Sequence, residues 1–154
     1  KLMAERENKL ITDLDPNIIM HSDRTRLSQV LLNILSNAAK YTDKGEIKVL
    51  TRKNAGGVQF VVEDTGVGMS DNDLNNLFQP FERFDNSLSV QSGGTGLGLY
   101  LTKKLIYDVL QGEITVESTL GNGSKFIVTL PLSLNDESNN TVKIVGDNIA
   151  GITA

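Results

Sequence analysis

One stretch of the sequence decides which fold to expect: Asn33-Ile34-Leu35-Ser36-Asn37-Ala38-Ala39-Lys40-Tyr41. It closes a segment whose apolar residues recur at the 3.6-residue period of a helix, namely Leu27, Val30, Leu31, Ile34, Leu35 and Ala38. Because Ser22 or Asp23 can cap such a helix, the pattern predicts one long helix that runs to about Tyr41. Its apolar stripe must face a core, while Asn33, Asn37 and Tyr41 recur along another side.

The rest of the chain alternates between strand-like and helical patterns. Strands are expected at residues 9–14, 46–52, 58–64, 113–118 and 125–130, and further helices at 70–78 and 97–110. Glycine-containing turns between neighbouring strands favour antiparallel pairing. The sequence therefore predicts an α/β (α+β) two-layer sandwich, in which a mixed, mostly antiparallel sheet is covered on one face by helices.

Composition restricts the class of protein. The 154 residues suit a single domain, and 39% of them are hydrophobic, which is enough to build a core. The net charge of −4 argues against a nucleic-acid partner, whose binding surface is usually basic. No apolar run approaches the roughly 20 residues that span a bilayer. Because cysteines are absent, disulfides and cysteine-ligated metal are excluded. We expect a cytoplasmic domain without direct membrane contact, even if a longer parent protein is membrane-anchored.

Changes in composition suggest the segment boundaries. Residues 1–8 are polar and helix-favouring, which indicates an incoming helix or linker, and residues 9–132 form the predicted domain. A polar linker and tail follow at residues 133–154, with one further strand expected at residues 142–148. We expect the sequence to be a piece of a longer protein.

Three clusters carry the chemistry, and the first is the helix end described above. An asparagine carbonyl oxygen is a suitable ligand for Mg²⁺, which shares its coordination with waters and phosphate oxygens. Lys40 supplies positive charge for a phosphate, and the Tyr41 ring can cover a base or a ribose. The simpler interpretation is that these asparagines face solvent, as most do.

The second cluster, Asp64-Thr65-Gly66-Val67-Gly68, follows an apolar strand. A partly buried carboxylate at a strand end needs a donor, and the 6-amino group of adenine is one. Guanine presents a carbonyl at that position, so a fixed acid would select ATP over GTP. Gly66 and Gly68 let the backbone approach the base closely. The alternative is a turn begun by an aspartate, with no ligand.

The third cluster, Gly94-Thr95-Gly96-Leu97-Gly98-Leu99, opens the second long helix. Free backbone N–H groups at a helix start stabilise anionic phosphates. The spacing differs from the dinucleotide-binding fingerprint and from the Walker sequence. The polar residues 86–92 before it suggest a lid over bound nucleotide, and a plain flexible loop is the alternative.

Together with Phe78-Gln79-Pro80-Phe81-Glu82-Arg83-Phe84, these clusters carry a family likeness. Residues 23–131 resemble the ATP-binding catalytic domain of sensor histidine kinases, in the wider group of DNA gyrase B, Hsp90 and MutL. The first cluster resembles the N box of that domain, residues 64–69 the G1 box, residues 78–84 the F box and residues 94–99 the G2 box. The resemblance implies a Bergerat-type ATP-binding fold with a mobile lid.

The resemblance also implies ligands, roles and partners. ATP and Mg²⁺ are the implied ligands, with Asn37 on the metal and Asn33 near the phosphates. Lys40 and Arg83 would contact phosphate, Tyr41 the nucleoside and Asp64 the adenine. The remaining implied ATP-binding residues are Gly66, Gly68, Gly94, Thr95, Gly96, Leu97, Gly98 and Leu99. The implied partners are the dimerisation domain of the same kinase, which carries the acceptor histidine, and the receiver domain of a response regulator.

Position 33 bears on the reaction, because gyrase-like ATPases have a water-activating glutamate there. Asn33 cannot act as a base, so we expect a protein-histidine kinase that passes the γ-phosphate of ATP to a histidine on a separate domain. A gyrase- or Hsp90-like ATPase clamp and a non-catalytic ATP-binding scaffold are the alternatives. His21 is a poor acceptor, because Ser22 stands where the adjacent acid is needed, and we expect it merely to end a strand.

Overall fold

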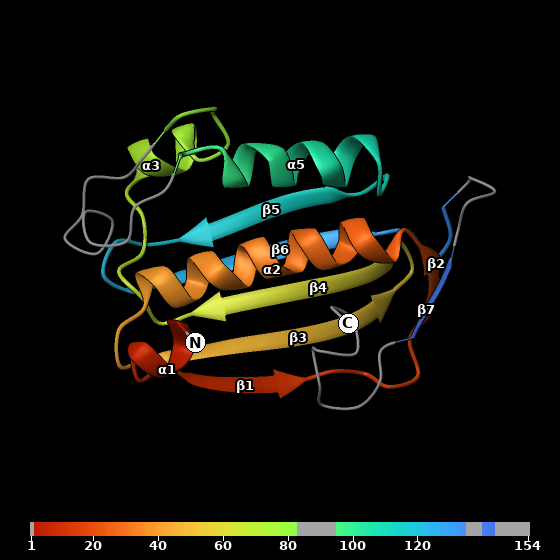
Figure 1. Cartoon of the computed structure of the whole chain (residues 1–154), viewed down its shortest axis with the longest axis horizontal. Helices are drawn as coiled ribbons and strands as arrows, with labels where there is room; N and C mark the ends of the chain where they lie inside the picture. Colours follow the sequence, from red (N-terminus) through yellow and green to blue (C-terminus); the bar gives the residue numbers. More distant parts are fainter. Residues whose placement is uncertain (1, 83–94, 135–139, 144–154) are drawn as a thin grey trace.

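The computed structural model describes residues 2–82, 95–134 and 140–143, and five strands of this part form one sheet (Figure 1). These strands are β1 (Lys9–Asp13), β3 (Glu46–Asn54), β4 (Gly57–Asp64), β5 (Glu113–Ser118) and β6 (Ser124–Leu130). Their order is β1-β3-β4-β6-β5, with β1 parallel to β3 and every other neighbouring pair antiparallel. The mixed, mostly antiparallel sheet predicted from the sequence is confirmed.

Helices cover one face of this sheet (Figure 1). The long ones are α2 (Arg24–Tyr41) and α5 (Gly98–Asp108), and the short ones are α1 (Leu2–Glu5) and α3 (Asp71–Asn76). Asp23 caps α2 as expected, since its side chain accepts from the backbone N–H of Arg26 at 2.9 Å. Ser70 and Asp73 form a capping box at the start of α3. The predicted two-layer sandwich is therefore confirmed.

The core lies between the helices and the sheet. Alternate residues of β4 point toward the helices, and Val58, Phe60 and Val62 are at most 1% exposed. Burying each such side chain stabilises the fold by about 1.5–3 kcal/mol. Asp64 continues this series by two residues and is 6% exposed. Strand periodicity thus places an acid on the core side of the sheet.

A second, two-stranded sheet was not expected from the sequence. It pairs β2 (Ile19–Ser22) with β7 (Asn140–Lys143) in antiparallel register. His21 lies within β2 and exchanges backbone hydrogen bonds with Leu132 and Leu134 on its other side. The strand expected at residues 142–148 is therefore present in its first part, and residues 144–148 lie outside the described residues. Leu134 is 7% exposed, so the packed domain continues past residue 132.

The segment before β1 is held by the end of α2. Asn8 Nδ2 donates to the carbonyl oxygens of Ala39 at 3.3 Å and Thr42 at 2.8 Å, and its Oδ1 accepts from Gly45 N–H at 3.1 Å. The last carbonyls of a helix have no partner within the helix. Asn8 thus caps α2 from 31 and 34 residues away along the chain.

We expect the substitution Asn8→Ala to lower the free energy of unfolding by about 1–3 kcal/mol, because it leaves part-buried carbonyls without their donor. Urea denaturation of both proteins measures this difference. Asn17→Ala is the matched control, since Asn17 is exposed in the turn before β2 and should change stability little. Equal stabilities of the Asn8→Ala and Asn17→Ala proteins would contradict the capping role.

Candidate nucleotide-binding site

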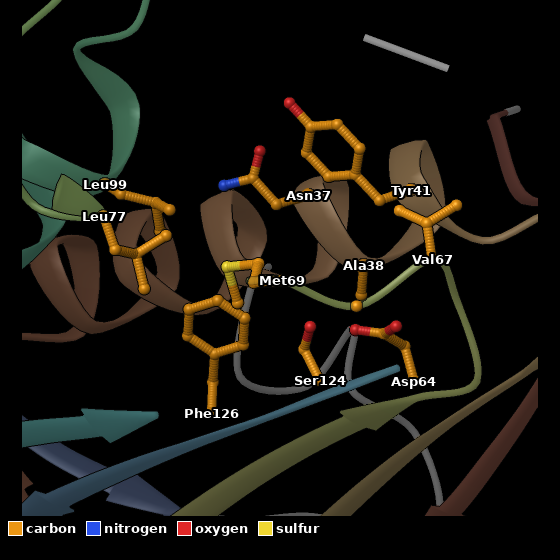
Figure 2. Close-up of a pocket in the computed structure, with 11 residues that line it drawn as sticks. Asn37, Ala38, Tyr41, Asp64, Val67, Met69, Leu77, Leu99, Ser124 and Phe126 are labelled. Atoms are coloured by element: carbon orange, nitrogen blue, oxygen red, sulfur yellow. The ribbon is translucent and has the colours of Figure 1, made fainter. Parts of the chain in front are cut away.

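A pocket lies where the second half of α2 meets the loop after β4 and the start of β6 (Figure 2). It is partly open to solvent, and its volume of about 390 Å³ includes some of that open space. Its lining residues are Asn37, Ala38, Tyr41, Asp64, Val67, Gly68, Met69, Leu77, Leu99, Ser124 and Phe126. Residues predicted from all three clusters therefore meet in one pocket.

Asp64 is the buried polar group of this pocket, beside Ser124, its register neighbour on β6 (Figure 2). Its Oδ1 accepts from the backbone N–H of Gly66 at 2.8 Å. Burial raises the pKa of the Asp64 carboxyl, and the neighbouring Glu63 carboxylate raises it further. The backbone N–H groups of Gly66 and Ser124 oppose this shift. The carboxylate can accept more hydrogen bonds than these, so a ligand with an N–H donor complements it.

Apolar side chains form the wall across from the asparagine. Met69, Leu77 and Phe126 are each at most 8% exposed, and Leu99 joins them from α5. Such a wall suits a flat ring system that is transferred from water. An apolar slot with a single acid at its base fits adenine, whose ring is flat and carries one amino donor.

The opposite rim of the pocket is the polar side of α2. Asn37 and Tyr41 both reach it, as their spacing of four residues predicts (Figure 2). Lys40 does not line the pocket. Its Nζ lies 5.0 Å from the centre of the Tyr41 ring, in a cation–π contact. The tyrosine ring and the lysine charge thus lie together at the end of the helix.

Asn33 faces α5 instead of the pocket. Its Nδ2 donates to Thr102 Oγ1 at 2.5 Å. A Cβ at position 98 would lie only 2.9 Å from Asn33 Oδ1, so glycine there lets the start of α5 approach α2 closely. Asn33 therefore joins the first and third clusters of the sequence.

The start of α5 has no side-chain cap. Its N-cap residue, Leu97, makes no side-chain hydrogen bond to the helix, and Thr95 Oγ1 accepts from Leu97 N–H at 3.4 Å. The carbonyl of Gly96 accepts from Phe81 N–H at 3.0 Å, which joins the start of this segment to the F-box region. Arg83, Phe84, residues 86–92 and Gly94 lie outside the described residues, so their predicted roles stay predictions.

The two glycines of the second cluster differ in position. Gly68 lines the pocket, with φ of 66°. Gly66 does not line the pocket, and its backbone lies close to other residues of the protein instead. A Cβ there would lie 2.3 Å from the Tyr41 carbonyl oxygen and 2.7 Å from Asp64 Oδ1. A side chain at position 66 would therefore push the loop after β4 away from the end of α2.

Sequence reasoning missed six of the lining residues: Ala38, Val67, Met69, Leu77, Ser124 and Phe126. A signal for two of them was present, since Ser124 and Phe126 alternate with Lys125 and must share one face of a strand. What was missing was the pairing of β6 with β4, which places Ser124 directly opposite Asp64. Register between strands cannot be read from either strand alone.

Metal binding here would depend on few protein ligands. Within residues 2–82, 95–134 and 140–143, no group of three or more His, Asp or Glu side chains is placed to hold a metal ion. Asn37 supplies one amide oxygen, and Mg²⁺ commonly takes its other ligands from water and phosphate.

Among residues 2–82, 95–134 and 140–143, no helix has the length and apolar character needed to cross a membrane.

Asp64 makes the stability of the domain depend on pH. Because burial raises its pKa in the folded state, its favourable contribution is complete below the unfolded value of about 4 and is lost as pH rises through the folded value. We expect Asp64→Asn, which keeps an oxygen for Gly66 N–H, to be more stable than the parent at pH 7. Urea unfolding should show this gain shrinking toward pH 4. Asp71→Asn, at an exposed acid, should give no gain. An Asp64→Asn protein less stable than the parent at pH 7, or a gain in Asp71→Asn, would contradict this expectation.

Comparison with known proteins identifies the family. Residues 22–134 match the family described as histidine kinase-, DNA gyrase B-, and HSP90-like ATPase. The sensor histidine kinase GacS of Pseudomonas protegens is 45% identical over 123 residues, which cover 77% of this chain and 13% of that protein.

Two solved structures share the fold. Full-length ShkA in complex with AMPPNP has a TM-score of 0.74 at 26% identity, over 96% of this chain and 28% of that one. The histidine kinase ThkA, in complex with the response regulator protein TrrA, has a TM-score of 0.68 at 26% identity, over 84% of this chain and 36% of that one. The chain spans less than a fifth of the length of the first curated relatives. It belongs to the histidine kinase-, DNA gyrase B- and HSP90-like ATPase family, as an ATP-binding catalytic domain of the sensor histidine kinase type.

Proposed function

We propose that this domain binds ATP with Mg²⁺ and positions the γ-phosphate for transfer to a histidine on the dimerisation domain of the same kinase. The observation that carries the proposal is the buried Asp64 carboxylate at the base of an apolar pocket whose rim holds Asn37 and Tyr41. The family match and the likeness to a kinase in complex with AMPPNP support the same assignment.

Recognition of the base rests on Asp64. A carboxylate accepts a hydrogen bond from the 6-amino group of adenine, whereas the carbonyl of guanine at that place would meet a second acceptor. Two acceptors without a proton between them leave both buried groups unsatisfied. The pocket therefore favours ATP over GTP, with Met69, Leu77 and Phe126 against the faces of the ring.

Recognition of the phosphates rests on charge around the pocket rim. Lys40 and the uncapped start of α5 supply positive potential, and Arg83 is proposed to add to it. Thr95, Gly96, Leu97 and Gly98 provide the backbone of that helix start. Asn37 would hold Mg²⁺, which when bound neutralises part of the phosphate charge.

The residues near α5 favour phosphoryl transfer over hydrolysis of ATP. The position that carries a water-activating glutamate in gyrase-like ATPases is Asn33, and its amide is hydrogen-bonded to Thr102. An amide cannot take a proton from water at neutral pH. Positioning and charge stabilisation suffice for transfer to an acceptor that arrives from another domain.

The proposed partners are other parts of the same signalling system. They are the dimerisation domain of the same kinase and the receiver domain of a response regulator, as the ThkA complex with TrrA suggests. We propose a cytoplasmic location, because ATP is supplied there.

The direct test is transfer of label from γ-labelled ATP to the isolated dimerisation domain of the same kinase, followed by detection of phosphohistidine. Asp64→Asn should weaken ATP binding by about 10- to 100-fold in calorimetry, because a hydrogen bond to a charged acceptor is lost. It should also reduce the preference for ATP over GTP. Unchanged ATP affinity in this variant would refute the placement of adenine.

Asn37→Ala should separate metal-dependent transfer from nucleotide binding. We expect ATP affinity without Mg²⁺ to change by less than about threefold, while phosphotransfer with Mg²⁺ falls at least about tenfold, since metal sites are sensitive even to outer-shell changes. Ser36→Ala, at the exposed neighbouring position of α2, is the control and should transfer like the parent. Metal-dependent transfer at the parent rate in Asn37→Ala would exclude Asn37 as a ligand.

A further inference from the structure

Thr42 contains a buried hydroxyl that the proposed function does not explain. It follows the last residue of α2 and is 0% exposed. Its Oγ1 forms no hydrogen bond with any residue that the structure describes. Buried hydroxyl groups almost always have a partner, so this one calls for a reason.

Two glycines fix the direction of the Thr42 side chain. A Cβ at position 45 would lie 2.6 Å from Thr42 Cγ2, and a Cβ at position 66 would lie 2.8 Å from Thr42 Oγ1. The methyl group therefore faces Gly45, and the hydroxyl faces Gly66. The backbone of Thr42 is also held, because its carbonyl accepts from Asn8 Nδ2 at 2.8 Å.

The hydroxyl meets the adenine-facing acid at Gly66. The same empty Cβ position lies 2.7 Å from Asp64 Oδ1, so the oxygens of Thr42 and Asp64 border one space. The hydroxyl forms no well-aligned hydrogen bond there, but it is close enough to lower the pKa of the Asp64 carboxyl against the effect of burial. A hydroxyl proton rotates about its C–O bond, so the Thr42 proton can turn toward the carboxylate.

We propose that Thr42 is a positioning residue, whose hydroxyl donates to the Asp64 carboxylate and keeps it an acceptor for the amino group of adenine. The assignment rests on the proposed role of Asp64 in ATP binding. Thr42 does not line the pocket, so it acts through Asp64. Donation to the charged form of an acid favours that form.

Other charges near Asp64 do not account for the effect that lowers its pKa. On β4 itself, Glu63 raises the pKa of Asp64 and so acts against the hydroxyl. Lys125 of β6 is paired with Glu117, Glu46 of β3 is paired with Lys9, and Lys40 of α2 lies over Tyr41. Among the described charged residues, Glu63 alone shifts the Asp64 pKa by its charge.

The first test follows the Asp64 carboxyl carbon by ¹³C NMR across pH, in protein without nucleotide. Thr42→Val keeps the shape of the side chain but lacks the donor, and should raise the pKa of Asp64. Thr42→Ser should restore the parent titration. Thr51→Val is the matched control at another buried threonine, whose Oγ1 accepts from Asp15 N–H at 2.8 Å, and should leave Asp64 unchanged. Identical titrations in Thr42→Val and the parent overturn the proposal.

The second test measures ATP affinity of the same proteins between pH 5 and pH 8. In Thr42→Val the affinity should fall relative to the parent by up to about tenfold at acidic pH for each unit that the Asp64 pKa rises. The deficit should be smallest at pH 8, and Thr42→Ser should remove it. Because the phosphates of ATP titrate equally in every sample, the ratio between proteins isolates the effect of Thr42.

The outcomes separate this inference from the proposed function. If the parent does not bind ATP, the adenine assignment fails, while the carboxyl titration still decides whether Thr42 acts on Asp64. If the parent binds ATP, Asp64→Asn does not, and Thr42→Val matches the parent at every pH, only the Thr42 assignment fails. Thr42→Ala, read in the same way, replaces Thr42→Val if the latter does not fold.

Discussion

The burial of one carboxylate, that of Asp64, is the constraint around which this domain is arranged. Strand β4 places Asp64 in the same alternating series as Val58, Phe60 and Val62, so the acid is on the core side by the geometry of the strand. A buried charge costs stability unless hydrogen bonds replace its water. The backbone N–H of Gly66 supplies part of that replacement, and the pocket beside it leaves room for a donor from a ligand. The proposed binding of the nucleotide and the stability of the empty domain are therefore linked through a single group.

Helix α2 connects the core, the pocket and the segment that enters the domain. One side of the helix packs Leu27, Val30 and Ile34 into the core, and another presents Asn37 and Tyr41 to the pocket. At its end, Asn8 binds the last carbonyls from outside, while the carbonyl of Tyr41 accepts from Val67 N–H of the loop after β4 at 3.1 Å. The incoming segment and the loop after β4 thus contact the same turn of helix. A displacement of one is opposed by the hydrogen bonds that hold the other.

The sequence predicted features that depend on local pattern and missed those that depend on pairing. The cap of α2 at Asp23 and the strands of the main sheet follow from residue type and periodicity, and they were predicted. The strand β2 was expected only as a strand end at His21, because it has four residues and only Met20 and Ser22 are buried. Ser124 was missed because its place beside Asp64 comes from register with β4. Asn37, Tyr41, Asp64, Gly68 and Leu99 could be assigned to one site only because the three clusters resemble those of a known family.

The contact between Asn33 and α5 bears on why a kinase and a hydrolase can share this architecture. Asn33 Nδ2 donates to Thr102, and Gly98 leaves the space in which the asparagine side chain reaches the start of α5. A glutamate at this position would replace the donor by an acceptor, leaving the Thr102 hydroxyl to donate to it, and would add a negative charge near the uncapped N–H groups that suit phosphate. That charge is useful where water must be deprotonated next to the γ-phosphate, and it competes with phosphate where no water is to be activated. The amide instead joins the two helices without charge, which agrees with the proposed transfer of phosphate to an acceptor on another domain.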